Sequence, residues 1–345
     1  MRDQHLQLLR TIELQRDGCA QAGSPLYVRL LNALERDLVD GGVSVDLLGP
    51  YGAAPVGDAV LLRLLAGVHR LVLEDRVPEL AAHFPSVGGM PGPGLERSFL
   101  AAVNDHAGTL GGDLRGGVQT NEPGRAAALL AGFWEIGRAG LPLRVLEVGA
   151  SAGLNLWFDR FGFRQDDWRW GPQDSPLVME SAFLGSPPRD SSIPVIAERR
   201  GCDLDPIDPA TETGRNRLRS FVWPDQAARL RRLEGAVAVA AQGRARVDRQ
   251  DGVSWLTDRL SEQVTGVATV VTHSIVFQYL SPEDQRSFLA VLDAAGAAAT
   301  PAAPLAWLRM EPVGDRAEVR LTRWPGGQTR LMAVSGFHGP PVALR

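Results

Sequence analysis

The residues best suited to chemistry form a short run, in which Glu147 is followed by small residues at alternate positions, Gly149, Ser151 and Gly153. Small residues let the backbone turn sharply and approach a ligand closely. Glu147 stands near the end of an apolar stretch, where its carboxylate can receive a ligand amine or a water molecule. The same run can also be a tight turn between a strand and a helix that binds no ligand.

These residues also spell G-x-S-x-G, the pattern of the nucleophile elbow in α/β-hydrolases, with Ser151 as the nucleophile. A hydrolase needs an acid and a histidine later in the chain, and Asp293 or Asp315 with His338 stand in that order. No His-Gly oxyanion segment precedes the elbow, and Glu147 would place a charge close to the serine. A serine hydrolase is therefore the main alternative interpretation.

Further candidates follow later apolar runs. The carboxylate of Asp203 can accept both hydrogens of a diol, while Asp205 beside it can instead cap a helix. Asp251 can hold an amine or be an ordinary loop acid. His273, in Thr-His-Ser, can act as a general base near neutral pH or bond a neighbouring loop.

A fourth group begins with Asn121, which is predicted to cap a helix that has Pro123 in its first turn. Arg125 in the same turn is unfavourable for the helix dipole, so it needs a carboxylate partner, either from a ligand or from Glu122. His338 lies in a loop near the C-terminus and can reach the same site or remain a surface histidine.

The elements that must position these residues alternate between strands and helices after residue 120. Such alternation predicts an α/β fold with a mostly parallel sheet covered by helices on both faces. Ligands of such sheets bind beyond the carboxyl ends of the strands. A final hairpin across Pro325-Gly326-Gly327 would add an antiparallel edge. The predicted strands are 143–148, 195–205, 245–247, 267–272, 305–310, 317–323 and 329–334, and the predicted helices are 121–140, 154–160, 227–241 and 282–295.

The first third of the chain shows apolar residues at helical spacing between Gly/Pro-rich loops, including a helix that starts at Ser24-Pro25 and one near 58–73. We expect two domains, a helical N-terminal cap at 1–117 and an α/β domain at 118–345. An insertion at about 161–194 interrupts the second, with alternating aromatic residues typical of a hairpin.

Composition limits the class of protein. The chain has 345 residues, of which 44% are hydrophobic and 22% charged, as in ordinary soluble domains. No apolar run approaches the roughly 20 residues of a membrane span, and the N-terminus is charged throughout, so we expect a cytoplasmic protein without a membrane partner. The net charge of −4 disfavours nucleic acid as a partner.

Lysine is absent, so all 36 basic residues are arginine. A Walker phosphate site, a pyridoxal Schiff base and a kinase-type nucleotide site all need a lysine, and these classes are excluded. Cys19 and Cys202 lie far apart and form no ligand cluster, so neither a zinc site nor a disulfide framework is expected. Both are expected to be buried free thiols.

Several segments together resemble a bacterial family, the domain of unknown function 2332, along nearly the whole chain. They are SPLY at Ser24, QTNEPGR at Gln119, LEVGASAGLNL at Leu146, GCDLDP at Gly201, VWP at Val222, THSIVFQYL at Thr272 and FHG at Phe337. The turn from Glu147 to Gly153 also resembles the first motif of methyltransferases that use S-adenosylmethionine (SAM). The two resemblances imply a Rossmann-like methyltransferase sheet with SAM as cofactor and a small-molecule substrate.

The methyltransferase resemblance also assigns roles to residues. It implies that Glu147, Gly149, Ser151 and Gly153 bind the methionine half of SAM, that Asp203 binds the ribose and Asp251 the adenine amine. Arg125 and Asn121 would border the SAM carboxylate, and His273 and His338 would be catalytic. In the family pattern the ribose acid follows the glycine turn by about 20 residues, whereas Asp203 comes only after the insertion. A serine hydrolase through Ser151 and a noncatalytic binding or regulatory protein remain the alternatives.

Overall fold

The computed structural model describes residues 2–54, 58–189, 191–243 and 245–345. It divides the chain into two compact units, Met1–Thr120 with Thr211–Arg231, and Asn121–Ala210 with Arg232–Arg345. The sequence-based boundary after residue 117 assigns 211–231 to the α/β domain, whereas in the structure these residues pack with the N-terminal helices. Residues 1 and 55–57 of the expected cap and residue 190 of the expected insertion lie outside the described residues.

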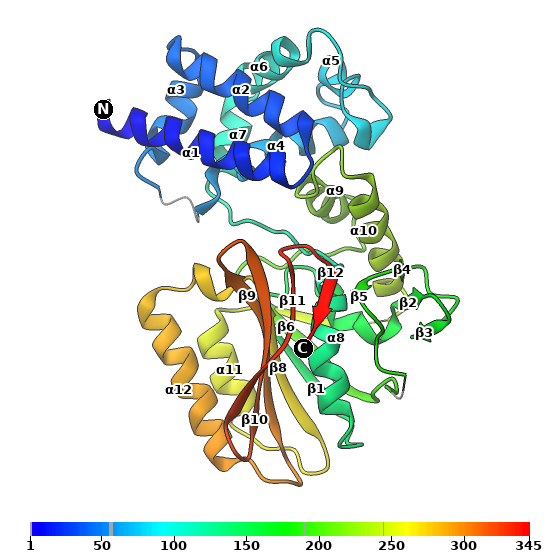
Figure 1. Cartoon of the computed structure of the whole chain (residues 1–345). Helices are drawn as coiled ribbons and strands as arrows, with labels where there is room; N and C mark the ends of the chain where they lie inside the picture. Colours follow the sequence, from blue (N-terminus) through cyan, green and yellow to red (C-terminus); the bar gives the residue numbers. More distant parts are fainter. Residues whose placement is uncertain (1, 55–57, 190, 244) are drawn as a thin grey trace. The chain divides into compact units, whose positions relative to one another are not determined.

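The first unit is helical, as the sequence predicts (Figure 1). The predicted helix start at Ser24 is confirmed, since the Ser24 hydroxyl accepts a hydrogen bond from the Tyr27 amide in the first turn. Its elements are α1 Arg2–Gln21, α2 Pro25–Val39, α3 Val43–Leu48, η1 Gly49–Tyr51, α4 Val60–Leu73, α5 Pro78–Ala81, η3 Pro85–Val87, α6 Leu95–Asp105, α7 Ala107–Asp113 and α9 Glu212–Ser220, and α10 Ala227–Ala240 crosses into the second unit.

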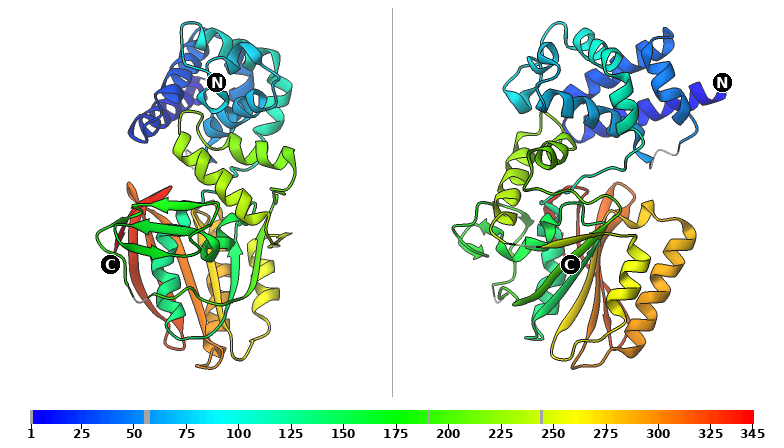
Figure 2. Two further views of the ribbon diagram at one scale, coloured as in Figure 1. Left: turned by 90° about the vertical axis from the view of Figure 1, so that its right-hand side faces the viewer. Right: turned by 180° about the vertical axis from the view of Figure 1, so that it is seen from behind.

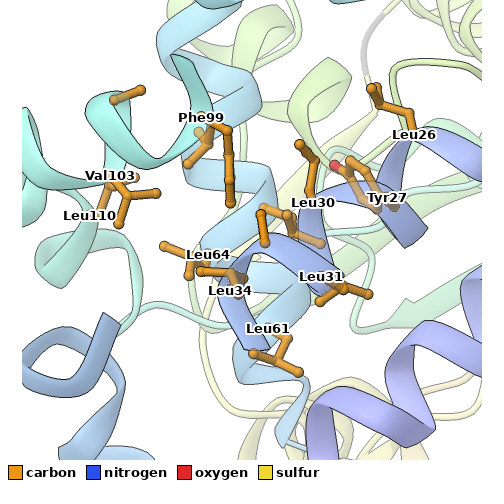
Figure 3. Packing of buried hydrophobic residues seen from close by; sticks show 14 of the residues in the cluster. Leu26, Tyr27, Leu30, Leu31, Leu34, Leu61, Leu64, Phe99, Val103 and Leu110 are labelled. Atoms are coloured by element: carbon orange, nitrogen blue, oxygen red, sulfur yellow. The ribbon is translucent and has the colours of Figure 1, made fainter. Parts of the chain in front are cut away.

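Leucines at helical spacing build the core of this unit (Figure 3). Leu30, Leu31 and Leu34 of α2 lie buried beside Leu64 of α4 and Phe99 of α6. Burial of each such side chain stabilises the fold by about 2 kcal/mol. The amphipathic pattern of the sequence therefore becomes the interior of a helical unit.

The segment after α9 is tied to the start of α2. The rings of Tyr27 and Trp223 lie 5.6 Å apart between centroids. The Ser24 hydroxyl donates to Asp225 at 2.7 Å, and the Leu26 amide donates to the same carboxylate at 3.0 Å. Two family segments about 200 positions apart in sequence thus form one joint within the first unit.

A buried histidine links separate segments within the same unit. The ring of His69, in α4, is hydrogen-bonded to the Ser220 carbonyl oxygen at 3.2 Å and to the Ser86 hydroxyl at 2.8 Å. Burial lowers the pKa of His69 to about 4, against the opposing effect of its backbone hydrogen bonds. The histidine is therefore neutral at pH 7 and connects α4, α9 and η3.

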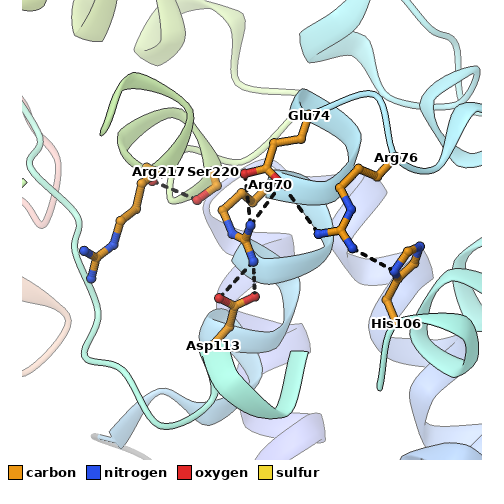
Figure 4. A network of polar contacts seen from close by, with 7 residues as sticks. All are labelled: Arg70, Glu74, Arg76, His106, Asp113, Arg217 and Ser220. Atoms are coloured by element: carbon orange, nitrogen blue, oxygen red, sulfur yellow. Dashed lines mark hydrogen bonds and ion pairs between the residues drawn. The ribbon is translucent and has the colours of Figure 1, made fainter. Parts of the chain in front are cut away.

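Ion pairs on the surface of α4 form a second set of links (Figure 4). Arg70 donates to Glu74 one turn later and to Asp113 in α7, at 2.9 Å and 2.7 Å. Arg76 reaches Glu74 and His106. The side chains of these ion pairs are partly exposed to solvent. Such pairs contribute modestly to stability, so the leucine core dominates the energetics of the unit.

The second unit is built on a nine-stranded sheet with the strand order β5-β12-β11-β10-β9-β8-β1-β6-β7. The five strands from β7 to β9 are parallel, and β9, β10, β11 and β12 pair antiparallel. The predicted mostly parallel sheet with an antiparallel C-terminal edge is confirmed. The strands are β1 Leu143–Val148, β5 Phe183–Leu184, β6 Ile196–Asp203, β7 Arg246–Arg249, β8 Ala268–Ser274, β9 Leu305–Val313, β10 Arg316–Trp324, β11 Gln328–Gly336 and β12 Gly339–Leu344.

Helices cover both faces of this sheet (Figures 1 and 2). On one face, α8 Arg125–Gly137 packs so closely that a Cβ atom at Gly132 would lie 2.2 Å from Leu308 of β9. On the other face, Trp255 of α11 Gly252–Leu260 and Phe288 of α12 Pro282–Ala298 pack against the strands. The two faces therefore carry separate cores.

The edge of the sheet differs from the prediction. The hairpin of β10 and β11 does not end the sheet, because β12 adds beside β11 and the short β5 pairs with β12. The expected hairpin within the insertion is present as β2 Gly162–Gln165 and β3 Trp168–Trp170, and β4 Val178–Glu180 completes a separate three-stranded sheet.

Two local predictions need correction. Helix α8 begins at Arg125 with Gly124 at the N-cap position, whereas the sequence predicts Asn121 as the cap. The Asn121 side chain instead accepts from the Leu154 amide. The segment after the glycine turn, Leu154–Arg160, is a 3-10 helix, η4, and Trp157 within it has non-helical dihedral angles.

Within the described residues, no helix combines the length and apolar character needed to cross a membrane. Cys19 and Cys202 are both buried and free. The expectation of buried free thiols is therefore confirmed.

Asp225 provides a test of the joint in the first unit. We expect Asp225→Ala to destabilise the protein by about 2 kcal/mol, because it removes two hydrogen bonds at the start of α2. Asp225→Asn keeps one acceptor oxygen and should lose less stability than Asp225→Ala. Urea unfolding of the full chain measures both, and equal stability of all three proteins would contradict this role.

Candidate functional site

The candidate site lies where the chain changes direction across the sheet. From β1 the chain continues to β6 and β7 on one side, and then to β8 and β9 on the other. The loops that follow β1 and β8 therefore leave the sheet in opposite directions. In open α/β sheets, ligands bind in the crevice beyond the carboxyl ends of the strands at this point.

Two polar side chains lie on the same sheet face at this position. Glu147 of β1 pairs in register with Thr272 of β8, so both side chains point to the same face of the sheet. Glu147 is 3% exposed, and its Oε2 atom and the Thr272 Oγ1 atom are buried without a hydrogen-bond partner. Because buried polar atoms are nearly always hydrogen-bonded, two unsatisfied oxygens on residues in register leave hydrogen-bonding capacity for a polar partner, either water or a ligand.

Burial controls the ionisation of Glu147. It raises the pKa of the carboxyl to about 8; the positive charge of Arg125 acts against this rise, and the negative charge of Asp203 adds to it. Glu147 is therefore mostly protonated at pH 7. A cation placed beside it would favour the ionised form.

The turn after β1 uses left-handed backbone at alternate residues. The φ angles of Gly149, Ser151 and Gly153 are +67°, +54° and +70°. Glycine adopts this region without a steric penalty, whereas serine does so at some cost. The alternating small residues seen in the sequence are thus explained by the path of the backbone.

Asp203, at the end of β6, supports this turn. One of its carboxylate oxygens accepts from the Ser151 amide at 2.9 Å, and the other accepts from the Asp205 amide at 2.9 Å. Asp205 forms an ion pair with Arg249. The carboxylate of Asp203 therefore lies at the glycine turn despite the long insertion that separates them in sequence.

Asp251 caps α11, because its side chain accepts from the Ser254 amide at 2.9 Å. The hydrogen bonds with the backbone and the hydroxyl of Ser254 outweigh burial and lower the pKa of Asp251. This carboxylate is ionised at neutral pH and already serves a helix start.

Arg125 joins two loops beside Glu147. Its guanidinium donates to the Ser274 carbonyl at 2.9 Å, at the end of β8, and to the Phe337 carbonyl at 3.0 Å. The loop containing Phe337 connects β11 to β12, and His338 follows in it, half-buried. A Cβ atom at Gly124 would lie 2.4 Å from the His338 carbonyl oxygen, so this loop packs directly on the start of α8.

A second pair of contacts joins the start of α8 to the glycine turn. The Asn121 side chain accepts from the Leu154 amide at 3.0 Å, and the Asn155 side-chain amide donates to the Glu122 carbonyl at 3.3 Å. The Asn155 Oδ1 atom is buried without a hydrogen-bond partner. Residues Asn121–Arg125 of QTNEPGR are therefore brought together with GASAGLN and FHG in the second unit.

His273 lies apart from this cluster. Since side chains alternate along a strand, His273 points to the sheet face opposite Thr272 and Glu147. It is 1% exposed, its Nε2 accepts from the Trp307 indole at 3.0 Å, and its Nδ1 lies 2.7 Å from Glu311 Oε1. Both ring nitrogens are engaged within the protein, which leaves neither for a proton transfer beside Glu147.

Glu311 is a residue of this region that its sequence context does not single out. Burial alone would raise its pKa, but the hydrogen bonds from His273 and from the amides of Val276 and Phe277 lower the pKa below its usual value. One feature of the sequence could still have identified Glu311: it is an acid near the end of the fifth parallel strand, where ligands and loops of such sheets gather.

Ser151 and its proposed triad partners are only partly brought together. Ser151 lies in the turn after β1, and His338 lies in the loop at the same end of the sheet. Asp315, between β9 and β10, has a side chain that is 91% exposed and pairs with Arg316. An acid so exposed is poorly suited to orient a histidine, and Asp293 lies in α12 on the opposite sheet face.

The ionisation of Glu147 makes a prediction about stability. A carboxyl whose pKa is raised on folding stabilises the folded state at low pH, and this contribution is lost as the pH rises from its unfolded value towards 8. We expect Glu147→Gln to be more stable than the natural protein by about 3 kcal/mol at pH 7. The difference, measured by urea unfolding, should widen between pH 5 and pH 8 and then stay level. A difference that does not vary with pH would contradict the assignment.

A protein-family model matches nearly the whole chain, including the segments that resemble a bacterial family. The model of a family described as "Uncharacterized protein conserved in bacteria (DUF2332)" matches residues 10–343. A search of curated proteins finds no match. The match runs from within α1 to within β12 and includes all the residues of the site. The chain therefore belongs to the DUF2332 family of bacterial proteins.

Proposed function

We propose that this protein is a SAM-dependent methyltransferase with a Rossmann-like sheet that acts on a small molecule. The observation that supports this most strongly is the pair of unsatisfied oxygens on Glu147 and Thr272. They lie at the point where β1 and β8 diverge, which is where open α/β sheets bind ligands.

The residues present fit the chemistry of SAM. SAM carries an ammonium and a sulfonium, and a buried carboxyl that ionises beside a cation is a suitable partner for either. An ammonium has three N–H donors, and Glu147 and Thr272 offer unsatisfied acceptor oxygens. The glycine turn and Asp203 would hold the rest of the molecule, as the first motif of methyltransferases implies. Asp251 retains oxygen lone pairs for an amine while it caps α11.

When bound, SAM supplies an electrophilic methyl group. The chain would then contribute binding and alignment, because a direct displacement needs mainly the correct geometry of acceptor and methyl. Glu147 would carry the charge opposite the cation, and Arg125 would hold the strand ends in place. Sequence reasoning gives the role of base to His273, but both of its ring nitrogens are already bonded, so we propose His338 as the base for an acceptor that carries a proton.

Calorimetric titration with SAM and with S-adenosylhomocysteine tests the proposal. We expect binding by the natural protein, and at least about tenfold weaker binding by Glu147→Gln and by Thr272→Val, since each loses a polar contact with the ligand. Thr269→Val is the matched control, because Thr269 is also buried in β8 but near its other end. Absence of binding by the natural protein would refute the proposal.

The titration should also depend on pH. If a cation ionises Glu147, binding at pH 7 releases close to one proton, and affinity rises with pH until about pH 8, where the free carboxyl is already half ionised. Titration in buffers of different ionisation enthalpy measures the proton release. Glu147→Gln should release none, and equal release by both proteins would count against Glu147 as the partner.

The two alternatives give different results. A serine hydrolase would be labelled by a fluorophosphonate, and the label would be lost in Ser151→Ala. We expect no labelling of the natural protein, and labelling that depends on Ser151 would replace the methyltransferase proposal. A noncatalytic protein would bind SAM or its demethylated product without transferring a methyl group to any component of a cell extract.

A further inference from the structure

The turn that follows β8 adopts an unfavourable conformation. Ile275 has a φ angle of +55°. A β-branched side chain in the left-handed region clashes with its own backbone, so such a residue is rare and costly. A conformation of this kind persists only where the surrounding contacts impose it.

The carboxylate of Glu311, on the same sheet face as His273, imposes this left-handed conformation. The Oε1 atom of Glu311 accepts from the Val276 amide at 3.0 Å and from the Phe277 amide at 3.2 Å, and lies 2.7 Å from His273 Nδ1. Because the Trp307 indole donates to the other ring nitrogen, His273 must carry its proton on Nδ1 and donate it to Glu311. Glu311 therefore receives three hydrogen bonds at one oxygen.

Neighbouring rings fix His273 in turn. Its ring lies within about 6 Å of the rings of Phe277, Phe288 and Trp307. The histidine cannot rotate without disturbing this packing, so the proton that it gives to Glu311 has a fixed direction. The pair forms a rigid unit beneath the turn.

The same turn also contacts the candidate site. Arg125 holds the Ser274 carbonyl on the sheet face that carries Glu147. The Val276 side chain packs against the glycine turn so closely that a Cβ atom at Gly149 would lie 2.5 Å from it. The position of Val276 thus sets the spacing between the turns that follow β1 and β8.

We propose that Glu311, acting with His273, is a positioning residue that holds the turn Ser274–Phe277 in its left-handed conformation and thereby shapes the ligand site. The proposal rests on the proposed function, because the ligand is taken to bind between the two turns. It gives His273 a role other than that of the general base expected from sequence. Neither residue needs to touch the ligand.

Hydrogen exchange and ligand titration on the full chain test this role. In Glu311→Gln we expect amide exchange in residues 275–277 to rise about tenfold or more, and affinity for S-adenosylhomocysteine to fall by a similar factor. Glu318→Gln is the matched control, since Glu318 pairs in register with Glu311 but binds Arg320. This control should match the natural protein in both measurements.

A second variant guards against misfolding. Glu311→Asp keeps the charge but withdraws the carboxylate from the turn, so both effects should be intermediate between those of the natural protein and Glu311→Gln. Unchanged exchange in both variants would overturn the proposal, and so would faster exchange with unchanged affinity. If the natural protein binds neither SAM nor S-adenosylhomocysteine, the proposed function fails, while the exchange measurement still decides whether Glu311 holds the turn.

Discussion

The central place of β1 in the sheet is the constraint on which the site depends. Since β6 pairs with one side of β1 and β8 with the other, the end of β1 is enclosed by protein on both sides. The Glu147 side chain points to the sheet face that α8 covers and is 3% exposed, and desolvation rather than a neighbouring charge dominates its ionisation. At pH values above the ordinary pKa of a glutamate, keeping this carboxyl protonated lowers the stability of the folded protein. Functional sites tolerate such a loss of stability.

Two turns meet at this place, and each is held by a carboxylate from a neighbouring strand. Asp203, at the end of β6, binds the backbone of the turn that contains Ser151. Glu311, in β9, binds the backbone of the turn that contains Ile275. In both turns a residue other than glycine adopts a positive φ angle. Hydrogen bonds to ionised oxygens are among the stronger ones, which suits them to hold strained backbone in place.

The family segments divide into two sets with different physical roles. SPLY and VWP meet within the helical unit, where a serine, a tryptophan and an aspartate join the start of α2 to a segment far along the chain. GASAGLN, GCDLDP, THSIVFQYL, FHG and the NEPGR part of QTNEPGR meet at the ends of the strands in the second unit. The first set joins two distant segments of the helical unit, and the second lies at the strand ends beside Glu147.

Several features of the protein follow from the sequence alone. The change from helical to alternating patterns predicts the helical unit and the mostly parallel sheet, because the spacing of apolar residues reflects local backbone geometry. Glu147, Gly149 and Gly153 are recognisable because a sharp turn needs small residues whatever surrounds it. The start of α2 at Ser24 is a local signal of the same kind.

Other features were decided only by the tertiary structure. The return of residues 211–231 to the helical unit and the addition of β5 and β12 to the sheet edge depend on contacts between distant segments. So does the start of α8, because the Asn121 side chain binds the Leu154 amide instead of capping the helix. His273 and Thr272 are adjacent in sequence, yet the alternation of a strand places them on opposite faces, and only the sheet order shows which face carries Glu147. Glu311 bears no motif, because its importance comes from amides and a histidine about 35 positions away. Local sequence encodes backbone conformation, whereas the partners of a buried polar group are chosen by how the whole chain packs.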